Sequence, residues 1–287
     1  MTDSSDEFCN NGRCERTKRG EKHRIHDISE YDDRQRESFK NLIQLGSQLT
    51  GGSIAASLLT AAYPEAILGQ LVGALLGHSL NIVGNEISRR FLAPREKTRI
   101  GAAFIYATRK AQERLNNGHI IRDDNFFSEQ PPERSAAEEI IEGVLLAAQR
   151  EHEEKKVRYY GYLLANIAFT TAINRAHANL LIRLSQSLSY GQLCLLAMFA
   201  QKDKFKLRIQ DYRGVGNISL HQLAVLQEAY GLTFLELINI PGDKVLGLTD
   251  INPGKMNLNG EGRLLVGLME LFSIDFEELA QISRLLQ

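Results

Sequence analysis

The sequence has little cysteine, almost no net charge and no apolar leader, and each shortage argues against a class of protein. Its 287 residues include three cysteines, too few for a disulfide scaffold, which favours the reducing cytoplasm. Lys and Arg total 34 against 35 Asp and Glu, so no global basic field attracts nucleic acid. The first residues mix acids and bases without an apolar core, and we therefore expect no secretory signal there.

Catalytic and cofactor motifs are also missing from the sequence. No glycine-rich loop follows an expected strand with phosphate-binding spacing, and no Gly-x-Ser-x-Gly turn presents a serine nucleophile. Cys194 lies in the apolar segment LCLLAMF, so we expect a buried, inert thiol. No Glu-x-x-His pair supplies ligands for a carboxylate-bridged metal centre. The sequence therefore predicts a protein that is not an enzyme and needs no cofactor.

Residues 1–30 are polar and charged without periodicity, which predicts a disordered leader. Four side chains in this leader are of the types that bind zinc. Their spacing departs from that of standard zinc fingers, and no apolar residues surround them to form a small core, so a plain polar tail is favoured over a metal site. The four candidates are Cys9, Cys14, His23 and His26.

The most unusual stretch covers residues 46–84, in which apolar residues alternate with Gly and Ala and Glu65 is the only charge. Breakers near Gly51 and Pro64 predict a helical hairpin whose second arm covers residues 65–91. Small residues recur in that arm at helical spacing, so one side of the helix is a groove in which a neighbouring helix packs closely. The expected helix-packing residues are Gly69, Gly73, Gly77 and Gly84.

This hairpin has two interpretations. Residues 66–85 carry no charge and approach the length that spans a bilayer, but Gln70, His78 and the glycines lower their hydrophobicity, so a permanent transmembrane helix is not expected. The hairpin is either tightly packed soluble core or a latent membrane segment. A basic cluster follows it, suited to anionic headgroups in the second case and a solvated helix end in the first. This cluster is Arg89, Arg90, Arg95, Lys97 and Arg99.

Helical patterns continue through the middle of the chain. Pro94 is expected to open a helix that Asn117 and Gly118 end, and Ser135 with Glu138 forms a capping box at the start of another. The charge run 150–156 is expected to continue the helix that Ser135 opens and to be exposed to solvent. Ser189 is expected to cap a later apolar helix.

The C-terminal third predicts helices with a small hairpin, a winged-helix-like outline. Residues 204–212 alternate like a strand, a helix over 218–230 ends at Gly231, and strands near 243–248 and 255–258 form the hairpin. Closing helices follow at 259–272 and 275–286. The helix that would enter the DNA major groove contains no Lys or Arg, so protein docking is favoured over DNA binding.

The order of these features resembles that of bacterial abortive-infection proteins of the Abi-alpha type, over roughly residues 46–200. The glycine-rich apolar region and a charged helix are followed by Leu163-Leu164-Ala165-Asn166 and then by Leu188-Ser189-Tyr190 opening a helix. The resemblance implies a role in antiphage defence through the cell envelope, with no catalytic residues to carry over. It does not cover the C-terminal third.

Together these patterns predict a mainly α protein with four parts. The parts are the leader (1–30), the glycine hairpin with the helix after it (31–118), a helical bundle (119–202) and the winged-helix-like domain (203–287). The leading hypothesis is a non-enzymatic bacterial effector that oligomerises or contacts membrane lipids through its glycine hairpin, being cytoplasmic until it reaches the inner membrane on activation. The alternative is a soluble regulatory module whose C-terminal domain docks a protein partner.

Overall fold

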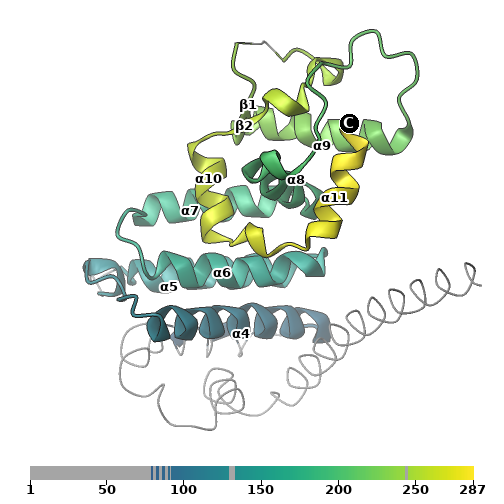
Figure 1. The fold of residues 1–287 in the computed structure, drawn as a ribbon. Coiled ribbons are helices and arrows are strands. Elements are labelled where there is room, and N and C mark those ends of the chain that lie inside the picture. Colours follow the sequence, from purple (N-terminus) through teal and green to yellow (C-terminus); the bar gives the residue numbers. More distant parts are fainter. Residues whose placement is uncertain are drawn as a thin grey trace, which may run out of the picture. The chain divides into compact units, whose positions relative to one another are not determined.

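The computed structural model of the chain describes residues 92–128, 133–242 and 245–287, together with residues 79, 82, 83, 86, 87 and 90. The leader and the glycine stripe of the hairpin lie outside these described residues. The described part is mainly helical, as predicted (Figure 1). Its helices are α4 (Pro94–Asn116), α5 (Ala136–Arg150), α6 (Val157–Ile167), α7 (Arg175–Ser187), α8 (Tyr190–Ala200), α9 (Leu220–Phe234), α10 (Gly260–Leu268) and α11 (Phe276–Leu285).

Several helices begin where local sequence signals place them. Pro94 is the first residue of α4, and the helix ends at Asn116, next to the Asn-Gly stop. The backbone N–H of Glu138 donates to the hydroxyl of Ser135 (3.2 Å), which caps α5. Ser189 forms a full capping box with Gln192 at the start of α8. The starts at Pro94, Ser135 and Ser189 are confirmed because a cap satisfies backbone groups only a few residues away. At α5 the Ser135 half of the predicted capping box forms, without a bond from the Glu138 side chain back to Ser135.

Helix α4 packs along α6, and small residues allow the two backbones to approach closely (Figure 1). A Cβ atom at Gly161 of α6 would lie 2.6 Å from the carbonyl oxygen of Ala103 and 2.6 Å from Cβ of Tyr106. Ala103 and Ala107 of α4 are themselves fully buried at this crossing. Gly161 is therefore required by the α4–α6 crossing distance.

Helix α8 is the core of the C-terminal helices. Its residues are apolar on all sides, and every residue from Gln192 to Phe199 is buried, because α9, α10 and α11 all contact it. Cys194 is buried there, as predicted, and burial raises the pKa of its thiol to about 12. Such a thiol stays protonated at neutral pH.

A two-stranded antiparallel sheet lies between α9 and α10, but its first strand is not the predicted one. Strand β1 (Ile238–Asn239) pairs with β2 (Asn257–Leu258), with Ile238 opposite Leu258. The predicted strand at 243–248 is wrong for its described part. The N–H groups of Leu246 and Gly247 both donate to the Asp250 carboxylate (2.8 and 3.1 Å), which makes a turn instead of a ladder.

Two other C-terminal predictions are wrong for tertiary reasons. Residues 204–212 form no strand, because their N–H groups reach two different elements, Arg208 donating to Leu286 and Tyr212 to Thr249. Helix α9 continues past Gly231 to Phe234. A Cβ atom at Gly231 would lie 2.9 Å from Nε2 of Gln192, so this glycine makes room for α8 instead of ending the helix.

The two central glycines of α5 and α6 give opposite predictions. We expect Gly161→Ala to lower the free energy of unfolding by about 1–3 kcal/mol, because its methyl group would overlap the α4 backbone. Gly143→Ala is the matched control: its Cβ would meet only Ile182 at 3.4 Å, so helix propensity should stabilise it by roughly 0.5–1 kcal/mol. Urea denaturation of both variants measures the difference, and equal effects would contradict the close crossing.

Candidate functional site

Most of the residues predicted to carry function lie outside the described residues. This applies to the packing glycines Gly69, Gly73, Gly77 and Gly84, to Arg89, and to the zinc candidates Cys9, Cys14, His23 and His26. What the structure does describe is the end of the hairpin arm. Ser79, Val83 and Ile87 are helical and buried at steps of four residues, and Leu92 is buried after them.

The described members of the basic cluster divide into two groups. Arg90 forms an ion pair with Glu142 of α5, and Arg99 donates to the backbone carbonyl of Glu151. Arg95 is exposed and Lys97 is half-buried at the beginning of α4. Two of the predicted headgroup contacts are therefore engaged with the protein itself.

Glu142 of α5 is the centre of an ion cluster that includes residues at the end of the hairpin arm. It binds Arg90 and also Arg134 (2.7 Å), and Arg134 reaches Glu86 at 3.7 Å. Hydrogen bonding from Arg134 outweighs burial and, with Arg90, holds the pKa of Glu142 below its ordinary value of 4.5. These side chains attach the end of the hairpin arm to α5.

The charge run 150–156 is not the exposed helical surface that its sequence predicts. Helix α5 ends at Arg150, and the chain turns before the short helix η3 (Glu154–Lys156) opens α6. Glu151 and Lys156 are buried, at 6% and 2% of their surface exposed, and form an ion pair of 2.6 Å. The sequence analysis missed this pair because a run of opposite charges is equally typical of an exposed helix face.

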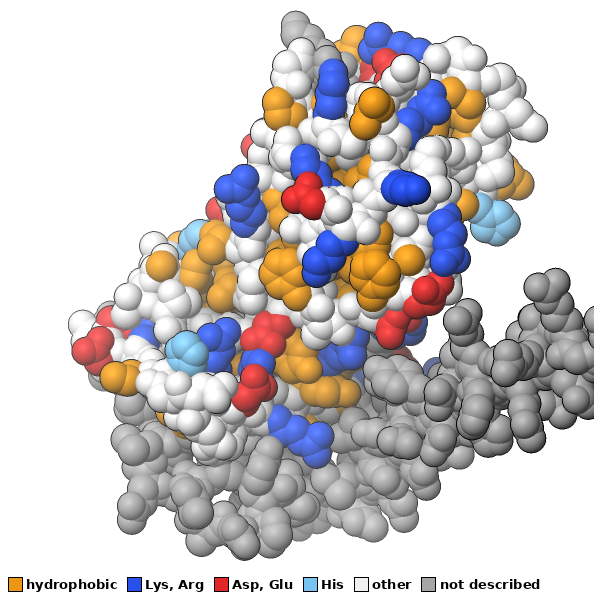
Figure 2. Space-filling view, viewed as in Figure 1, with side chains coloured by type: hydrophobic (Ala, Val, Ile, Leu, Met, Phe, Trp, Pro, Cys, Tyr) orange, Lys and Arg blue, Asp and Glu red, His pale blue; other side chains and the backbone are white. Residues whose placement is uncertain are grey.

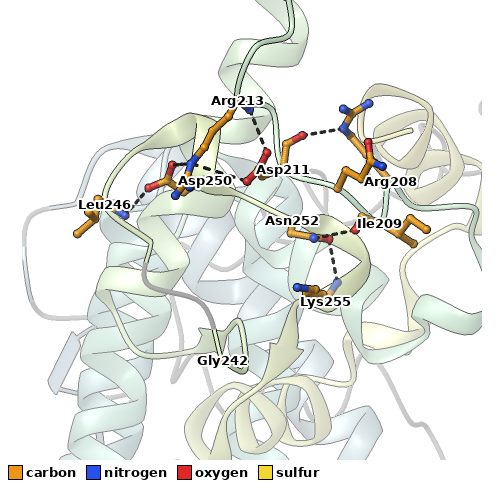
Figure 3. A pocket seen from close by; sticks show the side chains of 10 residues that line it. Arg208, Ile209, Asp211, Arg213, Gly242, Leu246, Asp250, Asn252 and Lys255 are labelled. Atoms are coloured by element: carbon orange, nitrogen blue, oxygen red, sulfur yellow. Dashed lines mark hydrogen bonds and ion pairs between the residues drawn. The ribbon is translucent and has the colours of Figure 1, made fainter.

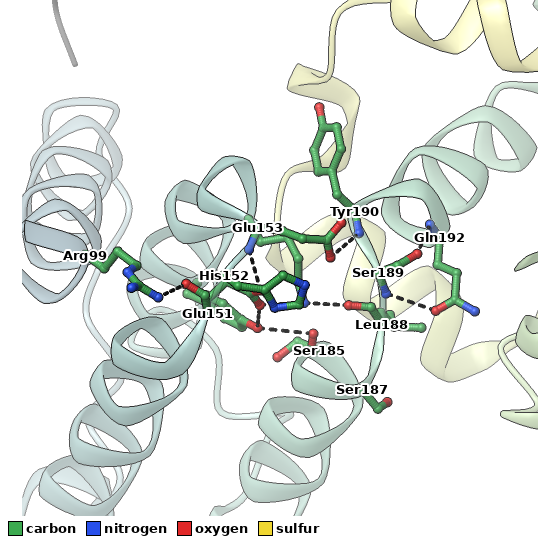
Figure 4. A network of polar contacts seen from close by, with 12 residues as sticks. Arg99, Glu151, His152, Glu153, Ser185, Ser187, Leu188, Ser189, Tyr190 and Gln192 are labelled. Carbon is green, nitrogen blue, oxygen red and sulfur yellow. Dashed lines mark hydrogen bonds and ion pairs between the residues drawn. The ribbon is translucent and has the colours of Figure 1, made fainter. Parts of the chain in front are cut away.

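Figure 4 shows Arg99 meeting the backbone of Glu151 where α5 ends, with Leu188 close by. The Lys156 ammonium donates to the carbonyl of Leu188, just before α8. The Tyr160 hydroxyl donates to the Glu151 carboxylate (2.8 Å). We call Arg99, Glu151, Lys156, Tyr160 and Leu188 the buried polar network.

The electrostatics of the network favour charged Glu151. Burial by itself would raise the pKa of Glu151, but Lys156, the Glu153 N–H and the Tyr160 hydroxyl together hold that pKa below 4.5. Burial and the adjacent Glu151 charge raise the pKa of Tyr160 above its ordinary value of 10. The two buried charges, Glu151 and Lys156, are matched to each other, and the half-buried Arg99 donates to a backbone carbonyl. The network is therefore suited to holding helices together and not to proton transfer with a substrate.

A second polar cluster explains a residue of the Leu-Leu-Ala-Asn segment. The side-chain amide of Asn166 donates to the carbonyl of Leu268 (2.8 Å) and to the carboxylate of Glu270 (3.2 Å). Glu270 also binds Lys110 (2.6 Å) and lies near Arg114 (3.5 Å) on α4. Glu270 has a left-handed backbone (φ 51°), which costs about 1 kcal/mol or more for a residue with a side chain. Its contacts to α4 and α6 offset that cost.

A depression of about 560 Å³ lies between the segment after α8 and the turn before β2 (Figure 3). Arg208, Arg213 and Lys255 bring positive charge to it, and Asp211 and Asp250 bring negative charge. Arg213 is bound to Asp250 (2.7 Å), and Asn252 donates to the carbonyl of Ile209 (2.8 Å). The pocket is nearly charge-balanced, so it offers no concentrated field to an ionic ligand.

Basic residues do not gather into a nucleic-acid surface on the face seen in Figure 2. Lys and Arg side chains lie singly among apolar ones over the C-terminal helices. Lys202 is bound to Asn257 (2.6 Å) and Lys204 to Gln201 (2.9 Å). As the sequence showed, α9 itself contains no Lys or Arg.

Comparisons with known proteins add nothing to this geometry. Protein-family models, curated proteins and solved structures give no match. Among the described residues, no group of His, Cys, Asp and Glu is arranged to hold a metal ion. In that same part of the chain, no helix is both long enough and apolar enough for a bilayer crossing.

Adjacent lysines test the importance of the buried polar network. We expect Lys156→Met to lower the free energy of unfolding by about 3–5 kcal/mol, because it leaves the Glu151 charge buried without a partner. Lys155→Met is the control, since Lys155 pairs with Glu278 at the surface, where such a pair contributes roughly 0–1 kcal/mol. Chemical denaturation followed by circular dichroism compares the two. Similar losses would contradict the structural role of the network.

The depressed pKa of Glu151 predicts a specific acid sensitivity. The carboxylate contributes stability above its unfolded pKa, near 4.5, and this contribution is lost as the pH falls through the lower folded value. Glu151→Gln should be less stable at neutral pH, and its free energy of unfolding should fall less steeply below pH 4.5 than that of the wild type. Denaturant titrations over this pH range measure both slopes, and parallel curves would refute the assignment.

Proposed function

We propose that this chain is a non-enzymatic bacterial protein that associates with membranes, or with further copies of itself, through the helical hairpin that contains the nearly uncharged stretch 46–84. Helices α4–α11 serve as the folded platform of that hairpin. The observation that carries the proposal is the attachment of the hairpin's end to the platform. Ser79, Val83 and Ile87 are buried, and Arg90 binds Glu142. The almost uncharged stretch 46–84 is therefore followed by a helix end that is attached to α5 through Arg90.

Physical chemistry explains why such a stretch would change its environment. With one charge and several glycines, it is too apolar to be favourable in water and too polar to be a stable permanent span. A glycine groove favours helix association in lipid, where apolar side chains gain nothing by leaving the bilayer for each other. The hairpin would therefore be shielded at rest and would associate in the membrane after a trigger.

Part of the basic cluster is available for the proposed headgroup contacts, and part is bound to the protein itself. Arg95 and Lys97 lie at the beginning of α4, outside the ion cluster of Glu142. In this proposal they contact anionic headgroups at the cytoplasmic side of a membrane, where each cation contributes about 1 kcal/mol. Arg90 and Arg99 would first have to leave Glu142 and Glu151.

The biological role we propose is that of an abortive-infection effector in antiphage defence. It rests on the resemblance to Abi-alpha proteins at residues 163–166 and 188–190. The amide of Asn166 in the first of these segments binds Glu270, and Ser189 in the second caps α8. Both segments therefore serve the fold of the platform, and the defence function is assigned to the hairpin.

A second candidate function belongs to the C-terminal helices. We infer, as the alternative, a regulatory module with a winged-helix-like outline that docks a protein. The observation that favours docking is α9, which has no Lys or Arg but leaves large apolar side chains exposed. DNA binding is not favoured, because phosphate contacts need those basic residues.

The glycine groove is tested on membranes. Purified wild-type protein should float with phosphatidylglycerol vesicles after activation, and chemical cross-linking should recover oligomers from them. The triple variant Gly69→Leu, Gly73→Leu, Gly77→Leu should lose at least roughly tenfold of the cross-linked oligomer, because leucine fills the groove.

The matched control adds the same three leucines at exposed glycines. Gly216, Gly260 and Gly267 have no atom within 4 Å of an added Cβ, so their replacement raises apolar content without touching the groove. This control should float and cross-link like the wild type. An unchanged amount of cross-linked oligomer in the groove variant would refute association through the glycine groove. A wild type that never floats would overturn membrane association and favour the second candidate.

A further inference from the structure

Helix α9 is apolar around most of its circumference but buries only one side. Leu226, Ala229 and Leu232 are its buried residues. On the opposite side, Leu220 and Phe234 leave 82% and 70% of their surface exposed. Positions 220, 223, 227 and 234 repeat at helical spacing, so they form one continuous stripe.

A neighbouring segment extends this stripe. Leu246 is 80% exposed, and its carbonyl accepts a hydrogen bond from the Tyr230 hydroxyl (3.1 Å). Tyr230 in turn contacts Phe234 edge to face, with the ring centroids 4.6 Å apart. We call Leu220, Leu223, Gln227, Phe234 and Leu246 the α9 face.

The charge of α9 limits what can cover this face. The helix has no Lys, Arg or Asp, and its one acid, Glu228, accepts a hydrogen bond from the Ser189 hydroxyl (3.0 Å) of α8. A nucleic acid or an acidic lipid surface finds no cation here, and a charged protein surface would bury charges without partners. A second copy brings an equally neutral face.

The order of residues along the stripe is also self-complementary. Gln227 lies midway between Leu220 and Phe234. In an antiparallel pair with a two-fold axis at Gln227, Leu220 of each copy meets Phe234 of the other, once at each end of the contact. The two Gln227 amides then face each other and can exchange hydrogen bonds.

A hollow lies where this pairing needs one. A depression of about 370 Å³ opens beside Phe234, and its lining combines Tyr230, Ile238 and Ile240 with polar residues that include the exposed Glu236. The antiparallel arrangement brings Leu220 of the second copy to this hollow. We propose that two copies of this chain pair through the α9 face, each inserting Leu220 beside the other's Phe234. This pairing is separate from the glycine hairpin and does not rest on the proposed membrane function.

The size of the face predicts a weak dimer. Its exposed apolar side chains offer on the order of 500 Å² per copy, below the roughly 800 Å² per partner of a standard interface. Association in the micromolar range is therefore expected. Sedimentation velocity over a concentration series of the full-length protein detects it as a shift from monomer to dimer.

The first test changes the charge of the face. Phe234→Glu should weaken the dimer at least tenfold, because each copy then buries one unpaired charge against Leu220 of the other copy. Ile120→Glu is the matched control, since Ile120 is 84% exposed in the loop after α4, and it should dimerise like the wild type. A wild type that stays monomeric, including one that instead binds an unrelated protein, overturns the proposal. So does a Phe234→Glu variant with unchanged dimerisation.

The second test reports the register and separates α9 from the hairpin. In a background with Cys9→Ser and Cys14→Ser, Gln227→Cys should form an intermolecular disulfide on mild oxidation, whereas Ile120→Cys should not. Cys194 is buried and does not compete. The cross-link should persist when Gly69, Gly73 and Gly77 are all leucine. Its loss in that variant would assign dimerisation to the hairpin, and equal cross-linking at Ile120→Cys would refute the register.

Discussion

The buried ion pair between Glu151 and Lys156 is the contact on which the arrangement of the helices depends. Neither charge would be stable alone at its level of burial, so each requires the other. Their partners lie on separate elements, namely Arg99 on α4, Tyr160 on α6 and the carbonyl of Leu188 before α8. One pair thus fixes the break between α5 and α6 and the position of the chain entering α8.

Close backbone contact supplies the rest of the platform's rigidity. Gly161 lets α6 lie against α4 with almost no space between them, and Glu270 connects the C-terminal turn to both helices. The strained backbone of Glu270 is held by these contacts. The N-terminal and C-terminal helices of the described chain are therefore joined by specific polar bonds as well as by apolar packing.

The two surfaces to which we assign function have opposite characters. The hairpin's end is fixed to α5 by ions, so the proposed membrane association requires those ion pairs to open or to carry the platform along. The residues of the α9 face carry no charge and are already exposed, so the proposed pairing requires no rearrangement. Dimerisation through α9 would also bring two hairpins together, which raises their effective concentration.

Local signals in the sequence predicted much of the fold. Pro94 and Ser189 act on backbone groups within one turn, and the apolar run of α8 requires burial in any fold, so these features need no tertiary knowledge. The burial of the Glu151–Lys156 pair and the role of Gly231 depended on residues distant in the sequence, namely Leu188 and Gln192. A charge run is equally consistent with solvent and with a buried partner, and a helical glycine is equally consistent with a stop and with close packing. The tertiary structure alone decided between these alternatives. It brings the carbonyl of Leu188 to Lys156 and the side chain of Gln192 to Gly231, and the local sequence does not specify such neighbours.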